Sequence, residues 1–425
     1  MSTQGIVRPI SPLERLPVLP AAALIWLIAL AIGAVGVFQR LTEGHAPAAY
    51  GSYIPWGMWV AAYVYLIGLS AGAFLISALV YVFDVRRLEP VGKLALFTAL
   101  IALIGALLII WLDIGHMERF WHVYVYGRPV SMMAWMVWLY TAYFVLILAE
   151  LWFALRHDLA RWSARRDIQG ALARLLTFGF RNVSAEAAAF DRRTLRLLGT
   201  IGVPLAIAFH GGVGALFASV AARPFWNAAI YPVAFIVGAL ASGGALLTAV
   251  IAFFWPERGT RDHRELVVFL GRMTLGLLLV YLLLEWAEFS IGLYGHVPGE
   301  STPYEEILSG QYWWVFWLIH IVVGSMIPIV LLTQLARSVP WVGLAGALIA
   351  GSFIAVRLNV VIPGLVTPQL EGLETAYVDS RLTFTYFPSL MEWLVVVFVG
   401  ALLVGLFYAG YRLLPLISAE EEAKS

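Results

Sequence analysis

Ten long apolar runs dominate the pattern of hydrophobic and polar positions along the chain. Each has about the 20 residues that a helix needs to cross roughly 30 Å of hydrocarbon. The runs lie near residues 18–38, 54–83, 93–115, 131–155, 195–221, 228–255, 267–294, 312–335, 339–362 and 387–413. Because only helices and closed barrels satisfy the backbone inside lipid, the pattern predicts an all-α integral membrane protein with about ten transmembrane helices.

The polar segments between the runs predict the orientation of the chain. Most of the 27 Lys and Arg residues precede the first run, follow the second, fourth, sixth or eighth run, or lie near the C-terminus. Basic residues stay on the cytoplasmic side of a membrane, so both termini are predicted to be cytoplasmic. The outer loops are rich in Pro, Gly and aromatic residues, which suits ordered docking surfaces. The basic inner loop of residues 156–196 is expected to contact membrane lipid.

Composition narrows the possible chemistry. Of the 425 residues, 61% are hydrophobic and 12% are charged, which is about half the charged fraction of a soluble protein. There are no cysteines, so this chain cannot supply thiolates for an iron–sulfur cluster, a covalently attached c-type haem or a disulfide. No P-loop or dinucleotide-binding fingerprint stands between a strand and a helix. Nucleotide chemistry and nucleic-acid binding are therefore not expected.

A faint internal repeat predicts how the helices group. Gly68-Leu-Ser-Ala-Gly-Ala73 in the second run aligns with Leu240-Ala-Ser-Gly-Gly-Ala245 in the sixth, and such small residues permit close helix crossings. The repeat predicts two four-helix bundles, residues 54–221 and 222–362. Residues 1–53 would hold a retained first helix, because its apolar run lacks a small-x-small cleavage site. Residues 363–425 would hold an outer loop, the last helix and a cytoplasmic tail.

Ionisable side chains are densest at the outer end of the third run. Asp113 and His116 are three residues apart and are expected to share one helical face. Oxidation of a quinol removes two protons with two electrons, and carboxylate and imidazole groups at the lipid border suit their acceptance. Alternatively, these groups only cap the helix and pair with one another, for example Asp113 with Arg119. The candidate quinone-binding residues are Asp113, His116, Arg119 and His122.

Six further ionisable residues fall inside the predicted spans. A charge in the bilayer centre is costly unless it is paired or hydrated, so the set is either a proton path through the second bundle or a buried structural ion-pair network. A b-type haem would need histidine pairs on facing helices; only two histidines lie well inside spans, and no haem or other metal is expected. The six residues are His210, Glu285, Glu288, His320, Arg357 and Glu392.

Short motifs, taken in order, carry a resemblance to a known family. They are Pro55-Trp-Gly57, Leu112-Asp-Ile-Gly115, Arg119-Phe-Trp-His122, Ser131-Met132, Arg223-Pro224 with Trp226-Asn227, Arg357-x-Asn359, and Tyr386-x-Pro388 with Glu392. From about Ser52 to Pro415 the chain resembles the NrfD/PsrC superfamily (polysulfide reductase membrane subunits), and within it the ten-helix branch of HybB, HmcC, DsrP and ActC. The polysulfide-type pattern has Pro after the Ser that opens the fourth helix, where this chain has Met132. Polysulfide is therefore not carried over as the substrate.

The resemblance implies a multi-pass subunit of the bacterial inner membrane that binds menaquinone or ubiquinone near its outer face. It implies electron exchange with a periplasmic ferredoxin-like iron–sulfur subunit, beyond which lies a molybdopterin enzyme, a hydrogenase or a multihaem cytochrome c. It also implies two related bundles, the second of which conducts protons. The chain would then be a quinone-reactive subunit of a respiratory oxidoreductase and would not be catalytic alone. A passive membrane anchor and a stand-alone secondary transporter remain as alternatives.

Overall fold

The computed structural model describes residues 19–377, 379 and 381–417. These residues form helices and connecting segments, and no strand occurs among them. Ten helices in this part of the chain are long and apolar enough to cross a membrane. The predicted all-α membrane fold with about ten spans is therefore confirmed. Arg8, Arg15 and Lys424, which contribute to the predicted orientation, lie outside the described residues.

The membrane-crossing helices follow the predicted runs in order. They are α1 (Leu19–Glu43), α2 (Met58–Tyr81), α3 (Gly92–Asp113), α5 (Met132–Trp162), α7 (Ala185–Ala218), α8 (Tyr231–Phe254), α9 (Arg261–Tyr294), η4 (Val315–Met326) continuing into α11 (Ile327–Gln334), α12 (Val339–Val361) and α15 (Leu390–Leu413). Shorter helices connect them. These are η2 (Arg86–Val91), η3 (Met117–Arg119), α4 (His122–Tyr126), α6 (Ile168–Leu176), α10 (Pro298–Leu308), α13 (Pro363–Val366) and α14 (Leu373–Ala376).

Several helices extend beyond the predicted apolar runs. Helix α7 begins ten residues before its run and α9 begins six residues before its own, and both have capped starts. The Ser184 hydroxyl accepts from the N–H of Ala187, and the Thr260 hydroxyl accepts from the N–H of His263. An apolar run marks only the part of a helix that lies in hydrocarbon, so it misses polar turns that continue beyond it.

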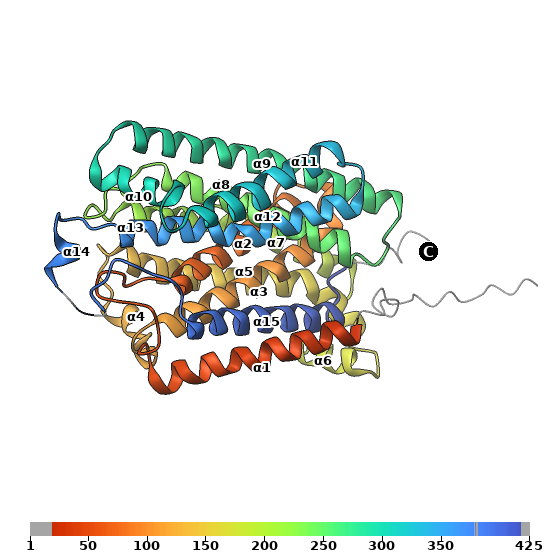
Figure 1. Cartoon of the computed structure of the whole chain (residues 1–425). Coiled ribbons are helices and arrows are strands. Elements are labelled where there is room, and N and C mark those ends of the chain that lie inside the picture. Colours follow the sequence, from red (N-terminus) through yellow and green to blue (C-terminus); the bar gives the residue numbers. More distant parts are fainter. Residues whose placement is uncertain (1–18, 378, 380, 418–425) are drawn as a thin grey trace, which may run out of the picture.

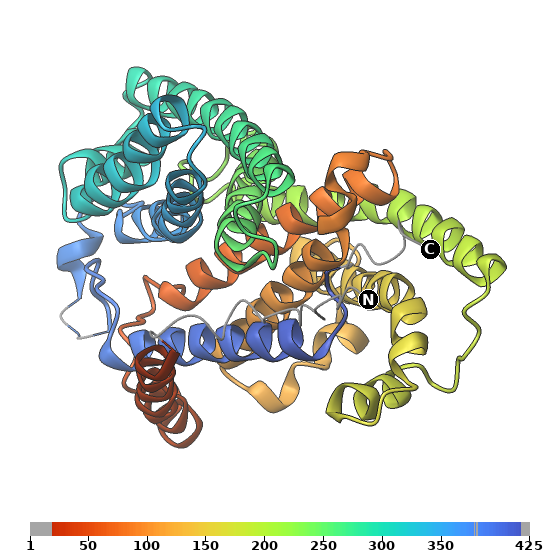
Figure 2. The ribbon, with the colours of Figure 1, turned by 90° about the vertical axis from the view of Figure 1, so that its right-hand side faces the viewer.

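The helices lie side by side, with the short helices gathered at the two ends (Figure 1). Helices α4, α10, α13 and α14 lie at one end, called the outer end here because the charge pattern predicts it to be outside. Helix α6 lies at the opposite, inner end. Helix α1 packs along α15, and α15 packs on α3. Figure 2 shows α1 and α15 at the edge of the molecule.

The two small-residue motifs meet where α2 crosses α8. A Cβ atom on Gly72 would lie 2.0 Å from the carbonyl oxygen of Ala239 and 2.9 Å from the Cα of Gly243. A Cβ on Gly243 would lie 2.6 Å from the backbone nitrogen of Ala73. The predicted close crossing is therefore present, and it requires glycine on both helices. The grouping into two bundles with the predicted boundaries stays a prediction.

Replacing Gly72 with alanine is expected to destabilise the protein by about 1–3 kcal/mol, because the added methyl group forces α2 and α8 apart. The matched control is Gly276→Ala in α9, where an added Cβ meets nothing within 4 Å and alanine is the better helix former. Thermal unfolding of both variants in one detergent measures the difference. Equal melting temperatures would contradict the close crossing.

Candidate functional site

Asp113, the last residue of α3, lies at the centre of a polar cluster at the outer end. Its Oδ1 atom accepts a hydrogen bond of 3.0 Å from the Tyr50 hydroxyl. Arg40, near the end of α1, donates to the carbonyl oxygens of Leu112 (2.6 Å) and Ile114 (2.8 Å), which flank Asp113. Arg40 is only 2% exposed. A buried guanidinium and a phenol thus hold the end of α3 where the aspartate stands.

Glu392 belongs to the same end of the molecule. It lies in the first turn of α15 and forms a capping box with Ser389. Its Oε2 accepts from the N–H groups of Ser389 and Ala49, each at 2.9 Å, and its Oε1 accepts from the Tyr386 hydroxyl. The sequence grouped Glu392 with the deeper groups because the apolar run starts before the helix does. The structure places it at the outer end, away from them.

Two tyrosines connect Glu392 to Asp113. The rings of Tyr50 and Tyr386 are stacked with centroids 6.4 Å apart, and Tyr50 donates to Asp113. A Cβ on Gly57 would lie 2.2 Å from Tyr50 and 2.3 Å from the Tyr386 hydroxyl, so only glycine fits there. Burial raises the pKa of both phenols, which keeps them protonated as hydrogen-bond donors. The glycine of the Pro55-Trp-Gly57 motif therefore makes room for this tyrosine pair.

His45 completes the cluster, and the sequence reasoning missed it. Its ring lies 5.5 Å from the ring of Tyr50 and 5.9 Å from that of Trp59. Its Nε2 atom is buried and has no hydrogen-bond partner among the described residues. Burial, assisted by the nearby Arg40 charge, lowers the pKa of His45 to about 4, so the imidazole is neutral at physiological pH. The available signal was a histidine just after the first apolar run, on the same side as Asp113.

The other three predicted quinone-site residues lie on an exposed segment beyond α3. His116 Nδ1 is 3.2 Å and Arg119 Nε is 3.5 Å from Glu118 Oε1, and His122 packs edge-on against Trp121. The considered Asp113–Arg119 pair is therefore wrong. The expectation that Asp113 and His116 share a helical face is also wrong, because α3 ends at Asp113 and the next residue is extended.

The deeper groups form a second cluster between α9 and η4. The Nε2 atom of His320 lies 2.7 Å from Glu285 Oε2, and the Tyr281 hydroxyl lies 3.5 Å from Glu285 Oε1. Glu288, one turn further along α9, accepts from the Tyr304 hydroxyl at 3.3 Å. His320 is 1% exposed. The structure thus brings together three of the predicted proton-path residues and supplies each with a polar partner.

His320 stands in an unusual helix. Residues Val315–Met326 form a π-helix, a wider conformation that is rare and often occurs at functional sites. The Ser325 hydroxyl donates to the carbonyl oxygen of His320 at 3.0 Å. A Cβ on Gly324 would lie 2.2 Å from the Ser352 hydroxyl of α12, so the π-helix packs closely on its neighbour. The apolar pattern predicted an ordinary span here.

Arg357 is buried among aromatic rings. Its guanidinium carbon lies 4.2 Å from the ring centroid of Phe235, a cation–π contact. Its Nε and one terminal nitrogen, and both ring nitrogens of His210, have no hydrogen-bond partner among the described residues. The alternative of a structural ion-pair network would give Arg357 a carboxylate partner. Among the described residues Arg357 forms no ion pair with Glu285, Glu288 or Glu392, and an aromatic face takes the place of the carboxylate.

Glu150 is a second residue that sequence reasoning missed. It lies in α5, is 1% exposed, and its Oε1 has no hydrogen-bond partner among the described residues. A Cβ on Gly202 of α7 would lie 3.1 Å from that oxygen, so glycine leaves space for the carboxyl group. The signal was an acidic residue inside the predicted run of residues 131–155.

The half-buried His45 is expected to make stability depend on pH. Its pKa is about 4 in the folded protein and 6.5 ordinarily, so acid protonates the unfolded chain first and stability falls as the pH drops from about 6.5 towards 4. Melting temperatures in detergent at pH 7 and pH 5 measure this loss. The loss should shrink in His45→Gln and stay unchanged in His116→Gln, whose side chain is exposed. The same loss in wild type and His45→Gln would contradict a half-buried neutral imidazole.

Comparison with known proteins places the chain in a family. Residues 47–369 match the family described as "Polysulphide reductase, NrfD". The chain is 38% identical over 397 residues to a selenate reductase subunit of Mesobacillus selenatarsenatis, covering 92% of this chain and 93% of that protein. It is 28% identical to the "Hdr-like menaquinol oxidoreductase integral membrane subunit" of Archaeoglobus fulgidus (92% of each). It is 22% identical to the "Menaquinone reductase, integral membrane subunit" of Nitratidesulfovibrio vulgaris (92% and 90%). The resemblance found in the sequence is thus confirmed, and the chain belongs to the polysulphide reductase NrfD family of integral membrane subunits.

Proposed function

We propose that this chain is the quinone-reactive membrane subunit of a multisubunit respiratory oxidoreductase. The observation that carries the proposal is the cluster of His45, Tyr50 and Asp113 at the outer end of α3, where an isoprenoid tail could stay in the bilayer. Two relatives are named as menaquinol oxidoreductase and menaquinone reductase membrane subunits. These names favour menaquinone as the substrate, although ubiquinone has the same hydrogen-bonding groups.

The chemistry follows from the protonation states. Oxidation of one quinol to a quinone releases two protons and two electrons. The neutral His45 imidazole, with its unpartnered Nε2, accepts one proton, and the Asp113 carboxylate accepts the other. The Tyr50 hydroxyl orients that carboxylate, and Tyr386 ties it to Glu392. In the opposite direction the same groups donate protons to the quinone.

The electrons leave the quinol one at a time to an iron–sulfur cluster on a partner subunit. We assign its docking surface to the exposed outer segment that carries His116, Arg119 and His122, where Phe120, Trp121 and Tyr126 are also exposed. Exposed aromatic and arginine side chains are enriched at protein interfaces. Relatives named as subunits of selenate reductase and dimethyl sulfoxide reductase support a peripheral redox enzyme beyond that partner.

A proton path through the second half of the chain is a separate part of the proposal. Glu285, Glu288 and His320 would form it together with Arg357 and His210, because buried ionisable groups at a π-helix are costly to keep without a function. Glu392 is proposed to act with Asp113 instead, since it lies at the outer end. Release of protons from the quinol and movement of protons along this path would then depend on different residues, so different variants would affect them.

Asp113→Asn is expected to lower quinol-linked turnover of the assembled complex by about 100-fold or more, because an amide cannot accept the proton. His45→Gln should act in the same direction. The matched control is Glu374→Gln in α14, an exposed carboxylate at the same outer end, which should retain turnover. If Asp113→Asn and His45→Gln both keep wild-type turnover and binding of a quinone-headgroup inhibitor, the chain is a passive anchor.

Glu285→Gln is expected to lower the number of protons translocated per electron while quinol oxidation continues. The measurement uses proteoliposomes of the assembled complex with a pH indicator and a quinol substrate. Glu305→Gln, which removes an exposed outer carboxylate, is the control and should leave the ratio unchanged. An unchanged ratio in Glu285→Gln would remove the proton path but leave the quinone site intact.

A further inference from the structure

A groove at the inner end of α8, α9 and α12 lies outside the proposed quinone and proton chemistry. A cavity of about 620 Å³ there is lined by Arg258, Arg264 and Arg337, among others. A neighbouring cavity of about 270 Å³ is lined by Arg87 and Arg272 together with the same Arg264 and Arg337. The shared arginines make the two cavities one feature, which we call the basic groove.

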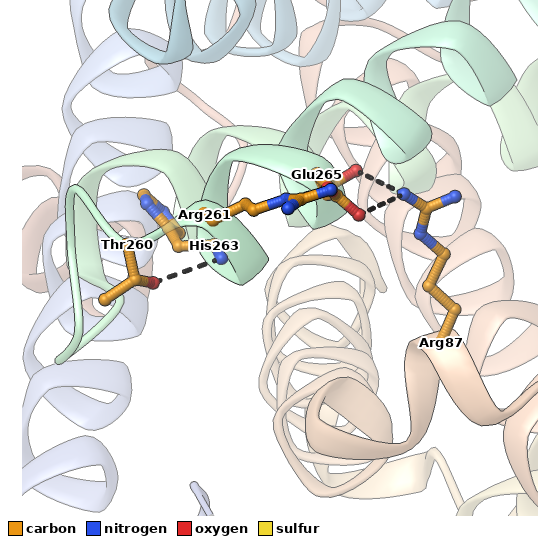
Figure 3. A network of polar contacts seen from close by, with 5 residues as sticks. All are labelled: Arg87, Thr260, Arg261, His263 and Glu265. Atoms are coloured by element: carbon orange, nitrogen blue, oxygen red, sulfur yellow. Dashed lines mark hydrogen bonds and ion pairs between the residues drawn. The ribbon is translucent and has the colours of Figure 1, made fainter.

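Among the described residues, the one acidic side chain that lines either cavity is engaged by arginines. The Glu265 carboxylate lies 2.8 Å from Arg261 Nε and 3.4 Å from a terminal nitrogen of Arg87 (Figure 3). Arg87 also lies over the Phe269 ring, 5.2 Å from its centroid. Two guanidinium groups thus offset the Glu265 charge, and Arg264, Arg272 and Arg337 leave the groove positive.

The groove also offers a helix end and an apolar wall. The N-terminus of α12 faces the groove, since the larger cavity is lined by Ser338, Val339 and Pro340. The Ser338 side chain does not cap the helix. The positive end of a helix favours an anion. Phe253 lines the larger cavity, and Val268 and Phe269 line the smaller one, so apolar side chains lie next to the arginines.

We propose that the basic groove binds the phosphate headgroup of an anionic phospholipid such as cardiolipin. A lipid fits better than a free anion because the groove opens at the ends of membrane-crossing helices, where lipid headgroups are expected, and its apolar wall can take acyl chains. Arg87 comes from η2 whereas Arg264, Arg272 and Arg337 come from α9 and the segment before α12. The bound lipid therefore bridges two parts of the chain that are far apart in sequence.

The test compares lipid binding by the delipidated full-length protein, with any partners that co-purify. Native mass spectrometry and melting temperature are measured with added cardiolipin, phosphatidylcholine or inorganic phosphate. The variant pair Arg264→Gln/Arg337→Gln should bind cardiolipin roughly 30-fold more weakly, because two basic contacts are lost. The control pair Arg86→Gln/Arg412→Gln removes the same charge from exposed positions at the inner end that line neither cavity and should bind as wild type does.

Three outcomes would overturn the proposal. Equal loss of cardiolipin binding in both variant pairs would mean general charge attraction to the inner end. Equal stabilisation of the wild type by phosphate and cardiolipin would mean a site for a soluble anion. Equal stabilisation by phosphatidylcholine would mean that the arginines do not select the headgroup. The last two comparisons use only the wild-type protein, so they decide the question even if the glutamine pair does not fold.

Discussion

The close backbone contact between α2 and α8 at Gly72 and Gly243 is the constraint on which the rest of the packing depends. Without hydrophobic attraction between helices in lipid, association relies on van der Waals contact, and small residues allow the closest approach. The segments that precede the two helices also meet, where Trp56 stacks on Trp226 with ring centroids 5.6 Å apart. Helix α2 is thereby held along its length by α8 and at its start by this stacking. These contacts fix the first turn of α2, where Gly57 and Trp59 contact residues of the outer cluster.

The outer cluster shows how a membrane protein keeps many polar groups at a helix boundary. Each carboxylate has a phenol donor, Tyr50 for Asp113 and Tyr386 for Glu392, and backbone N–H groups supply further hydrogen bonds to Glu392. Burying a polar group costs little when it is hydrogen-bonded and much when it is not. His45 Nε2 is the exception in this cluster. A buried acceptor without a partner is what a substrate hydroxyl would need.

The second half of the chain handles its buried charges differently. Glu285 and His320 satisfy each other, whereas Arg357 lies against aromatic rings with unpartnered nitrogens. A cation–π contact offsets only part of the cost of removing a guanidinium from water. The residues of the family motifs fall into two groups, those that connect helices and those in the outer cluster. Trp226 donates to a backbone carbonyl of α12 and Arg223 donates to carbonyls in and just after α13, so they hold the fold, while Asp113 lies in the cluster that we propose binds quinone.

The sequence by itself determined the helices, because a run long enough to cross the hydrocarbon is a local property that no distant residue needs to complete. It also indicated that the two small-residue stretches permit close helix crossings and that Asp113 lies at a helix end. Only the tertiary structure decided the partners of these groups. Asp113 meets Tyr50, 63 positions away, and Glu392 meets Ala49, 343 positions away. Such contacts depend on which helices pack together, so His45 and Glu392 joined the site only when α1, α2, α3 and α15 were assembled.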